Sequence, residues 1–329
     1  FHTGNETSPV GRTRTAPEAE ALPERLRFAF TSCQHFESGY FNGYPHMQKE
    51  DLDLIVHLGD YIYEYRGANN RPRKHLGGEI ETLDEYRTRY AQYRLDPMLA
   101  DAHRLFPWLV TWDDHEFDNN YADLVSEEEG IAPEKFLARR MNAYQAYYEF
   151  MPLRRRSFPQ GPHMTLYRGC PYGRLANFHV LDTRQYRTDQ PNGDHQKPMV
   201  GKALDPQATM LGARQEHWLM QSLAQSTATW NVLAQQVMMA PLNRGEGEDA
   251  RYSMAVATYR GHGVEVARSC GPRPACSSSA MVRRLQCDGR QANQVEGAKE
   301  LARLAEARHP MALFTMAMLR DEELRHKVR

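Results

Sequence analysis

Short apolar runs recur along this chain, and several of them end in a cluster of polar residues. Alternating apolar positions predict a strand over Leu26–Thr31, and continuous apolar runs predict buried strands over Leu52–Leu58 and within Leu105–Trp112. Two later segments, Arg174–Leu181 and Trp230–Met239, have the same strand character. The core is therefore expected to contain several short, buried strands.

Helical segments lie between these strands. Leu83–Arg94 and Arg214–Gln225 have helical patterns, and Pro133–Phe150 begins with proline, a residue favoured in the first helical turn. The aromatic face of this last helix consists of Phe136, Tyr144, Tyr147 and Tyr148. Strands interspersed with helices indicate an α/β fold.

The polar residues that follow four of the strands are typical metal ligands. They are Cys33, Asp60, Asp113, Asp114, His115 and Asp182. Ligands of α/β sheets bind outside the carboxyl ends of the strands, so these side chains are expected to converge. Converging carboxylates repel one another unless a cation lies between them, and the pattern therefore predicts a metal site.

Composition narrows the function classes. The 329 residues include 41 Lys and Arg and 42 Asp and Glu, for a net charge of −1, which excludes a strongly basic nucleic-acid binder. With 41% apolar and 25% charged residues, the chain has the composition of one large or two ordinary globular domains of about 150 residues. The longest apolar runs, such as Leu54–Val56, fall far below the ~18 residues of a membrane span. The mean hydropathy of −0.72 is nevertheless low for such a domain.

The cysteines and the first residues carry weaker signals. Residues 1–25 are rich in Thr, Pro, Gly and charge and are expected to form a linker, with no targeting peptide visible. The spacing of the five cysteines matches no zinc ribbon or C-x-x-C motif. They are Cys33, Cys170, Cys270, Cys276 and Cys287.

The motif Gly59–Tyr65 (GDYIYEY) directly follows a predicted buried strand. Asp60 offers a hard oxygen ligand, and Gly59 permits a tight turn beside it. Tyr63 returns to the same site if the loop makes a single turn, and a phenolate suits a hard, trivalent metal. The alternatives are a simple turn for Asp60 and a packing role for Tyr63.

The motif Trp112–Asn120 (WDDHEFDNN) follows the next predicted strand. Asp114 and His115 are candidates for a metal ligand and a general acid, and the alternative is a solvated polar loop. That alternative is disfavoured because the preceding residues WLVTW should be buried. The residues expected to support the site from behind include Asp113, Glu116, Asp118, Asn119 and Asn120.

Two further motifs complete the candidate site. Cys33 in TSCQH is either a thiolate ligand at the first strand end or a core cysteine. In LDTRQYR, Arg184 and Arg187 are candidates to clamp a phosphate by paired hydrogen bonds. The alternative there is a surface ion pair between Asp182 and an arginine.

In this order, the four motifs resemble those of the PhoD-like alkaline phosphatases, which belong to the calcineurin-like metallophosphoesterases. Gly212–Gln236 and Ser8–Pro17 are also similar to that family, so the resemblance covers roughly Ser8 to Tyr252. It implies a four-layer α/β (α+β) sandwich of two facing mixed β-sheets flanked by helices, formed by residues 26–254. It also implies that residues 1–25 are the tail of an N-terminal β-sandwich domain.

The resemblance implies an activity as well. It implies a secreted, periplasmic or cell-wall-associated monomer that hydrolyses small phosphate monoesters or diesters. Neither a membrane span nor specific nucleic-acid binding is expected. The implied cofactors are ferric iron and calcium, with other divalent metals as alternatives. Two metals roughly 3.5–4 Å apart activate a hydroxide that attacks phosphorus.

Residue roles follow from the same resemblance. Cys33, Asp60 and Tyr63 would hold the iron. Asp60 would bridge to a second metal, which Asp114 would also bind. His115 and Arg184 would be catalytic, and the supporting residues would be Asp113, Glu116, Asp118, Asn119 and Asp182.

One family motif is missing from its expected place. A later strand that ends in G-D-x-H should supply further ligands, yet none follows Trp230–Met239, and residues 255–329 depart from the family pattern. We therefore hypothesise that the coding frame changed after about Met254. The alternative to an active phosphoesterase is then an inactive remnant that only binds metal or phosphate. A carbohydrate hydrolase with paired carboxylates is a remote alternative, because the adjacent Asp113 and Asp114 are expected to point apart.

Overall fold

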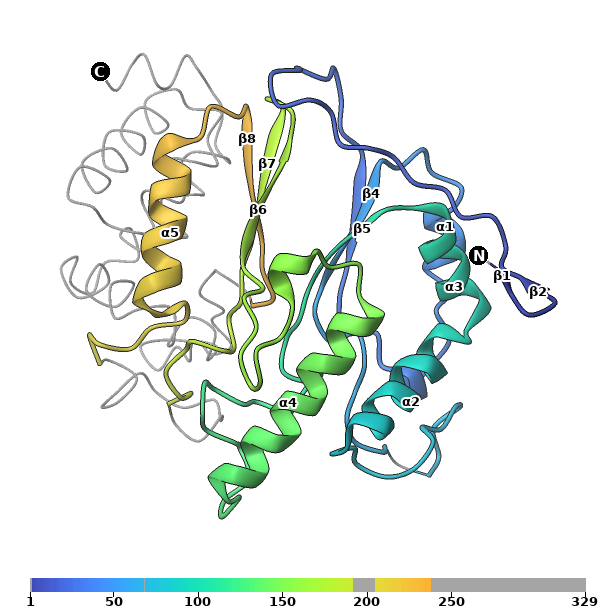
Figure 1. The fold of residues 1–329 in the computed structure, drawn as a ribbon, viewed down its shortest axis with the longest axis vertical. Coiled ribbons are helices and arrows are strands. Elements are labelled where there is room, and N and C mark those ends of the chain that lie inside the picture. Colours follow the sequence, from blue (N-terminus) through green and yellow to red (C-terminus); the bar gives the residue numbers. More distant parts are fainter. Residues whose placement is uncertain (1, 68, 192–204, 238–329) are drawn as a thin grey trace, which may run out of the picture. The chain divides into compact units, whose positions relative to one another are not determined.

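The computed structural model describes residues 2–67, 69–191 and 205–237 (Figure 1). The predictions made for residues 255–329, namely the missing G-D-x-H motif and the altered frame, lie outside these residues. Among the described residues, no helix is long and apolar enough to cross a membrane.

The chain divides into two compact units. The first consists of Phe1–Gln185 and Leu233–Gln236, and it holds every predicted site residue except Arg187. The second consists of Tyr186–Val232 and Val237–Arg329, and its described helix is α5 (Gly212–Gln225).

A parallel sheet of three strands organises the first unit. Its order is β3 (Phe28–Thr31), β4 (Leu54–Leu58) and β5 (Trp108–Thr111), as three of the apolar runs predicted. Thr31 pairs with His57, and Leu58 pairs with Thr111, so the three strands end side by side. The polar motifs that follow them therefore emerge at one edge of the sheet.

Four α-helices accompany this sheet: α1 (Tyr44–Met47), α2 (Leu83–Arg94), α3 (Pro97–Leu105) and α4 (Pro133–Phe150). The predicted bounds of α2 and α4 are confirmed, and the two helices pack against each other. Thr82 and Glu85 form a capping box at the start of α2. The sequence prediction missed α3, although Asp96 caps its first turn and proline occupies its first position.

A second sheet contains a hairpin that the apolar pattern only half predicted. β6 (Arg168–Tyr172) pairs antiparallel with β7 (Ala176–Val180), and the sheet order is β6, β7 and β8 (Trp230–Ala234). β6 escaped prediction because it contains glycine and proline, which are rare in strand interiors. The predicted strand Trp230–Met239 ends earlier, at Ala234.

Short elements complete the described chain. β1 (His2–Thr3) and β2 (Glu6–Thr7) pair antiparallel within the segment that was expected to be a linker or the tail of an N-terminal β-sandwich domain. Two single turns of 3-10 helix are η1 (Phe36–Ser38) and η2 (Arg155–Ser157).

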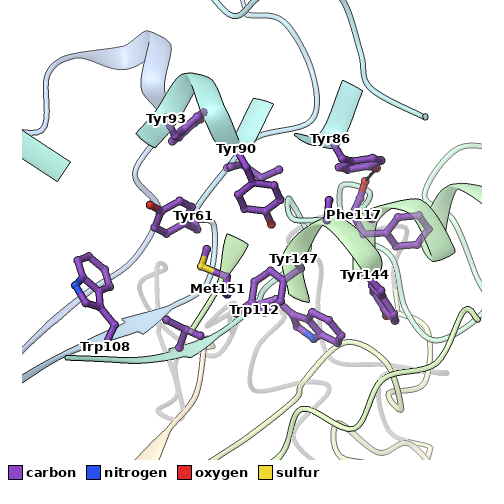
Figure 2. Packing of buried hydrophobic residues seen from close by; sticks show 14 of the residues in the cluster. Tyr61, Tyr86, Tyr90, Tyr93, Trp108, Trp112, Phe117, Tyr144, Tyr147 and Met151 are labelled. Carbon is purple, nitrogen blue, oxygen red and sulfur yellow. Dashed lines mark hydrogen bonds between the residues drawn. The ribbon is translucent and has the colours of Figure 1, made fainter. Parts of the chain in front are cut away.

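The core of the first unit is unusually rich in tyrosine (Figure 2). The buried rings include Tyr61, Tyr86, Tyr90, Tyr93, Tyr121, Tyr144 and Tyr147. The predicted aromatic face of α4 is confirmed at Phe136, Tyr144 and Tyr147, and Tyr144 stacks on Trp112 with ring centroids 4.3 Å apart. Tyrosine adds large buried area while keeping a polar hydroxyl, so this core accounts for part of the low mean hydropathy.

Candidate metal and phosphate site

The loops after β3, β4 and β5 are tied together at the carboxyl edge of the parallel sheet. The amides of Cys33 and Gln34 donate to the carbonyls of Gly59 and Asp60, both over 3.1 Å. Gly59 has φ +101°, and a Cβ there would lie 2.6 Å from the Cβ of Asp113. Only glycine therefore allows the second and third loops to approach this closely.

Two of the predicted metal ligands adopt strained backbone conformations. Cys33 and Asp60 both have φ +55°, a left-handed conformation that non-glycine residues seldom adopt. Each of them directly or closely follows a strand end, where the chain turns sharply toward the site. Such strain concentrates at functional sites because the surrounding structure must compensate for it.

Glu116 fastens two of these loops from behind. Its carboxylate accepts hydrogen bonds from the amides of Asp60 (3.1 Å), Tyr61 (2.5 Å) and Asp113 (2.8 Å). Burial and the neighbouring charge of Asp60 hold the pKa of Glu116 well above its usual range. The Glu116 side chain thus joins the loop after β4 to the loop after β5.

Three side chains form a compact group of possible metal ligands. One ligand atom each of Asp60, Asp114 and His115 lies within 4.8 Å of the other two. The Tyr63 hydroxyl donates to Oδ2 of Asp60 over 3.0 Å, whereas the buried Oδ1 of Asp60 receives no hydrogen bond from the described residues. A buried, uncompensated carboxylate oxygen beside further oxygen and nitrogen donors fits a hard cation.

Cys33 adjoins this group through Asp60. Its thiol hydrogen-bonds with Asp60, and partial burial together with the charge of Asp60 raises the pKa of Cys33 to about 12. Without a cation the thiol is therefore protonated, and a bound metal would reverse this by stabilising the thiolate. Cys33, Asp60 and Tyr63, which the resemblance assigned to one metal, are thus brought together.

The carboxylates divide into two kinds. Burial, followed by the charges of Asp113 and Asp114, raises the pKa of Asp60 to about 7. Burial also disfavours the charged form of Asp114, but Arg184 and His115 outweigh it and lower the pKa of that carboxyl. A bound cation would therefore stabilise the ionised form of Asp60 more than that of Asp114.

His115 is held by Glu64, a residue that the motif analysis did not single out. The Nδ1 atom of His115 lies 2.8 Å from Oε2 of Glu64, whose other oxygen accepts the amide of Asn119 over 3.0 Å. Burial lowers the pKa of His115, but the hydrogen bond and charge of Glu64 dominate and raise it to about 10. Nδ1 is thus committed to Glu64, and Nε2 remains for a metal or a substrate oxygen.

Arg184 contacts both acids of the third loop. Its Nε lies 2.5 Å from Oδ1 of Asp113, and its Nη2 lies 3.3 Å from Oδ1 of Asp114. The expectation that these adjacent acids point apart is therefore wrong, because they follow β5 in a turn and not on an extended strand. The buried Nη1 of Arg184 has no hydrogen-bond partner among the described residues.

Asp182 lies in the interior and not at the surface, where the alternative of a surface ion pair placed it. It is fully buried, and its Oδ1 accepts the amides of Arg184 (3.0 Å) and Gln185 (2.9 Å). It therefore shapes the turn that directs Arg184 toward the acids. Arg187, the other predicted phosphate clamp, is buried as well.

Asp118 and Asn119 lie one layer away from the ligand group. Asp118 pairs with Arg139 on α4 over 2.8 Å and accepts the Ser126 hydroxyl over 2.7 Å. The Asn119 side chain donates to Glu127. Both residues fix the segment that continues from the third loop, and no local pattern predicts the pairing of Asp118 with Arg139, which lies 21 residues away.

Gln236 is a further residue that sequence reasoning missed. Its amide nitrogen donates to Thr111 Oγ1 over 2.9 Å and to the carbonyl of Trp112, and its oxygen accepts the Thr183 hydroxyl over 2.8 Å. It joins the end of β5 to the turn after β7. No local pattern could predict this contact, because the partners are more than 50 residues away.

The comparison with known proteins shows the family to which this chain belongs. A sequence model of the PhoD-like phosphatases matches residues 28–299, and the chain belongs to this family. The predicted resemblance is thereby confirmed.

Two relatives are informative. The chain is 54% identical over 260 residues to alkaline phosphatase D of Bacillus subtilis, an alignment that covers 77% of this chain and 44% of the relative. A solved structure described as that of PhoD matches with 53% identity and a TM-score of 0.74, covering 77% of this chain and 49% of that one. The chain thus spans less than half the length of these relatives.

Proposed function

We propose that this chain hydrolyses phosphate esters, monoesters or diesters, at a metal centre at the carboxyl edge of its parallel sheet. The observation that carries the proposal is the buried Oδ1 of Asp60, which has no donor among the described residues and lies within a group of further ligands. A carboxylate in this state is costly to bury unless a cation compensates for it.

Iron and calcium are the proposed metals. Cys33, Asp60 and Tyr63 would hold ferric iron, for which a thiolate, a carboxylate and a phenolate form a suitable donor set. Asp114 would hold the second metal, calcium or another divalent ion, with Asp60 shared between the two. When bound, the metals neutralise phosphate charge and lower the pKa of a bound water to generate the attacking hydroxide.

His115 and Arg184 would act on the phosphate. Glu64 holds Nδ1 of His115, so Nε2 is oriented to give a proton to the leaving oxygen. Arg184 is pinned by Asp113 and Asp114, and its Nη1 can donate to an equatorial phosphate oxygen without reorganising. Donors that are oriented in advance stabilise the charge that develops during transfer.

The remaining predicted residues would keep these groups in position. Glu116 binds backbone amides of two loops, and Asp182 shapes the turn before Arg184. Asp113 pairs with Arg184, Asp118 with Arg139, and Asn119 with Glu64. Each of these contacts involves a residue or loop that carries a proposed ligand or donor.

From the resemblance to the family, we also propose several features of the whole protein. They comprise the four-layer arrangement of two mixed sheets, secretion, a monomeric state and a preceding domain. The similarity to phosphatases over 77% of the chain gives no support to the alternative of an inactive remnant.

The test is turnover of p-nitrophenyl phosphate and of its bis ester by the full chain with iron and calcium, alongside its metal content. In the Asp60→Asn variant, we expect turnover to fall at least 100-fold and the bound iron to be lost. Folded, metal-loaded protein without turnover of either ester would reject phosphoester hydrolysis. A Glu134→Gln variant, altered at an exposed position of α4, is the matched control.

A further inference from the structure

A cavity lies in the first unit, at the edge of the parallel sheet opposite to the proposed metal site. It has a volume of about 320 Å³, and its lining includes Leu54 at the start of β4 and Trp108 at the start of β5. The proposed metal ligands follow the other ends of these strands. A strand of five residues spans about 16 Å, so the cavity is distinct from the metal site.

Arginines dominate the charge of this cavity. Arg14, Arg154, Arg156 and Arg168 line it, and Asp53 is the one acid among the described lining residues. Asp53 is already paired with Arg14, because its Oδ1 lies 2.5 Å from Arg14 Nη1. The cavity therefore carries a clear excess of positive charge.

The other arginines are arranged differently. Arg168 is buried, and its two Nη atoms donate to the carbonyls of Leu166 and Val110, each over 2.8 Å. Arg154 and Arg156 are exposed, and no ion pair links either of them to a described residue. Burial and the like charge of Arg156 contribute to lowering the pKa of Arg168. An anion between these guanidinium groups would relieve their repulsion.

Apolar side chains form the rest of the wall. Cys170 on β6 and Phe178 on β7 are direct cross-strand partners, and both face the cavity together with Leu54, Trp108 and Pro171. Trp108 is nearly buried, and its indole nitrogen donates to a backbone carbonyl over 3.2 Å, which fixes the ring. A concave, mostly apolar wall with a few convergent charged groups is typical of a small-molecule site.

We infer that this cavity binds an organic anion that combines an apolar, ring-sized body with a phosphate or carboxylate group. The apolar body lies against Trp108 and Phe178, and the anionic group faces Arg154 and Arg156. This binding requires no metal and does not depend on the proposed phosphoesterase activity.

Calorimetry on the full chain tests this inference with two anionic probes and a neutral one. Phenylphosphonate has no ester bond to hydrolyse and represents the phosphate class, phenylacetate represents the carboxylate class, and benzyl alcohol lacks the charge. We expect at least one anionic probe to bind saturably and at least tenfold more tightly than benzyl alcohol. The stronger anionic probe identifies the preferred head group.

A matched pair of variants locates the charge contact. The double variant Arg154→Ala/Arg156→Ala should weaken anion binding at least tenfold, because paired guanidinium contacts to an oxyanion are lost. Arg155→Ala removes the exposed arginine between them, which does not line the cavity, and should leave binding unchanged. Equal weakening by both variants would overturn the assignment.

Cys170 provides a positional readout. It is a half-buried free cysteine in the cavity wall, so a bound probe should slow its alkylation by iodoacetamide, measured by peptide mass spectrometry. Cys33 beside the metal group serves as the internal reference in the same sample. Binding that protects Cys33 but not Cys170 would assign the probe to the metal site instead, and no binding by either anion would refute the inference.

Discussion

Arg184 and Asp113 form a 2.5 Å ion pair although they lie 71 positions apart in the sequence. The pair connects the turn after β7 with the loop after β5, and the same guanidinium reaches Asp114. The arginine proposed to meet the phosphate is therefore positioned by acids that flank the proposed metal centre. The charged groups proposed to bind substrate and those proposed to bind metal therefore belong to one network of ion pairs.

This network predicts that Arg184→Lys is not a conservative change. Lysine keeps the positive charge but cannot contact Asp113, Asp114 and a phosphate oxygen together, because it lacks the planar fork of arginine. We expect kcat/KM for p-nitrophenyl phosphate to fall roughly 100-fold, in the range seen when one oriented donor is removed. Arg155→Lys, at an exposed position, should retain wild-type kinetics, and an equally active Arg184→Lys enzyme would contradict the role.

Glu64 is predicted to act through His115. Glu64→Gln keeps a hydrogen-bond acceptor but removes the charge that holds the imidazole, so kcat should fall about tenfold or more while the metal content stays unchanged. Steady-state kinetics combined with elemental analysis separates these effects. Glu134→Gln on the exposed start of α4 is the control, and loss of metal without a change in kcat would argue against this role.

Gly59 is predicted to be a stability hot spot. Gly59→Ala forces φ +101° on a residue with a side chain and creates a contact with Asp113, so unfolding free energy should fall by about 2–5 kcal/mol. Gly78→Ala is the matched control, because a Cβ there meets no atom within 4 Å. Urea unfolding compares the two variants, and equal stabilities would show that the loops can separate without cost.

The burial of His57 is predicted to lower the stability of the folded protein in acid. It is buried on β4, and burial, followed by the charge of Arg94, lowers its pKa to about 3. In the unfolded chain, His57 has its ordinary pKa of 6.5. Above that pH the imidazole is neutral in both states, so its burial does not reduce the stability of the folded chain. This stability is lost as pH falls from 6.5 toward 3, to a total on the order of 5 kcal/mol.

Urea unfolding between pH 4 and pH 7 measures this slope. His57→Gln should be less stable at pH 7 but should show a flatter decline toward pH 4 than the wild type. His46→Gln, at an exposed position, should decline in parallel with the wild type. Parallel curves for His57→Gln would show that His57 does not contribute to acid sensitivity.

The local elements were largely predictable from the sequence. The bounds of α2 and α4 follow from caps and an aromatic face, which act within a few residues. By contrast, β6 contains glycine and proline and is a strand because it pairs with β7. The pattern carried no information on that pairing, since strand partners are selected by the fold.

The candidate site divides in the same way. Cys33, Asp60, Tyr63 and Asp114 were identified from their position after apolar strands, and the structure brings them to one edge because those strands are parallel. The contacts of Glu116 with three backbone amides, and of Gln236 with the ends of β5 and β7, had no signal in the sequence. Each depends on loops meeting in space.

The sequence by itself therefore determined which side chains have the chemistry for metal and phosphate, because those residues sit in recognisable motifs at strand ends. Only the tertiary structure decided their charge states and orientations. Burial raises the pKa of Asp60, Glu64 holds His115, and Arg184 lies against two acids because distant segments pack there. Electrostatic energies depend on distances and burial in three dimensions, and these are properties of the folded chain.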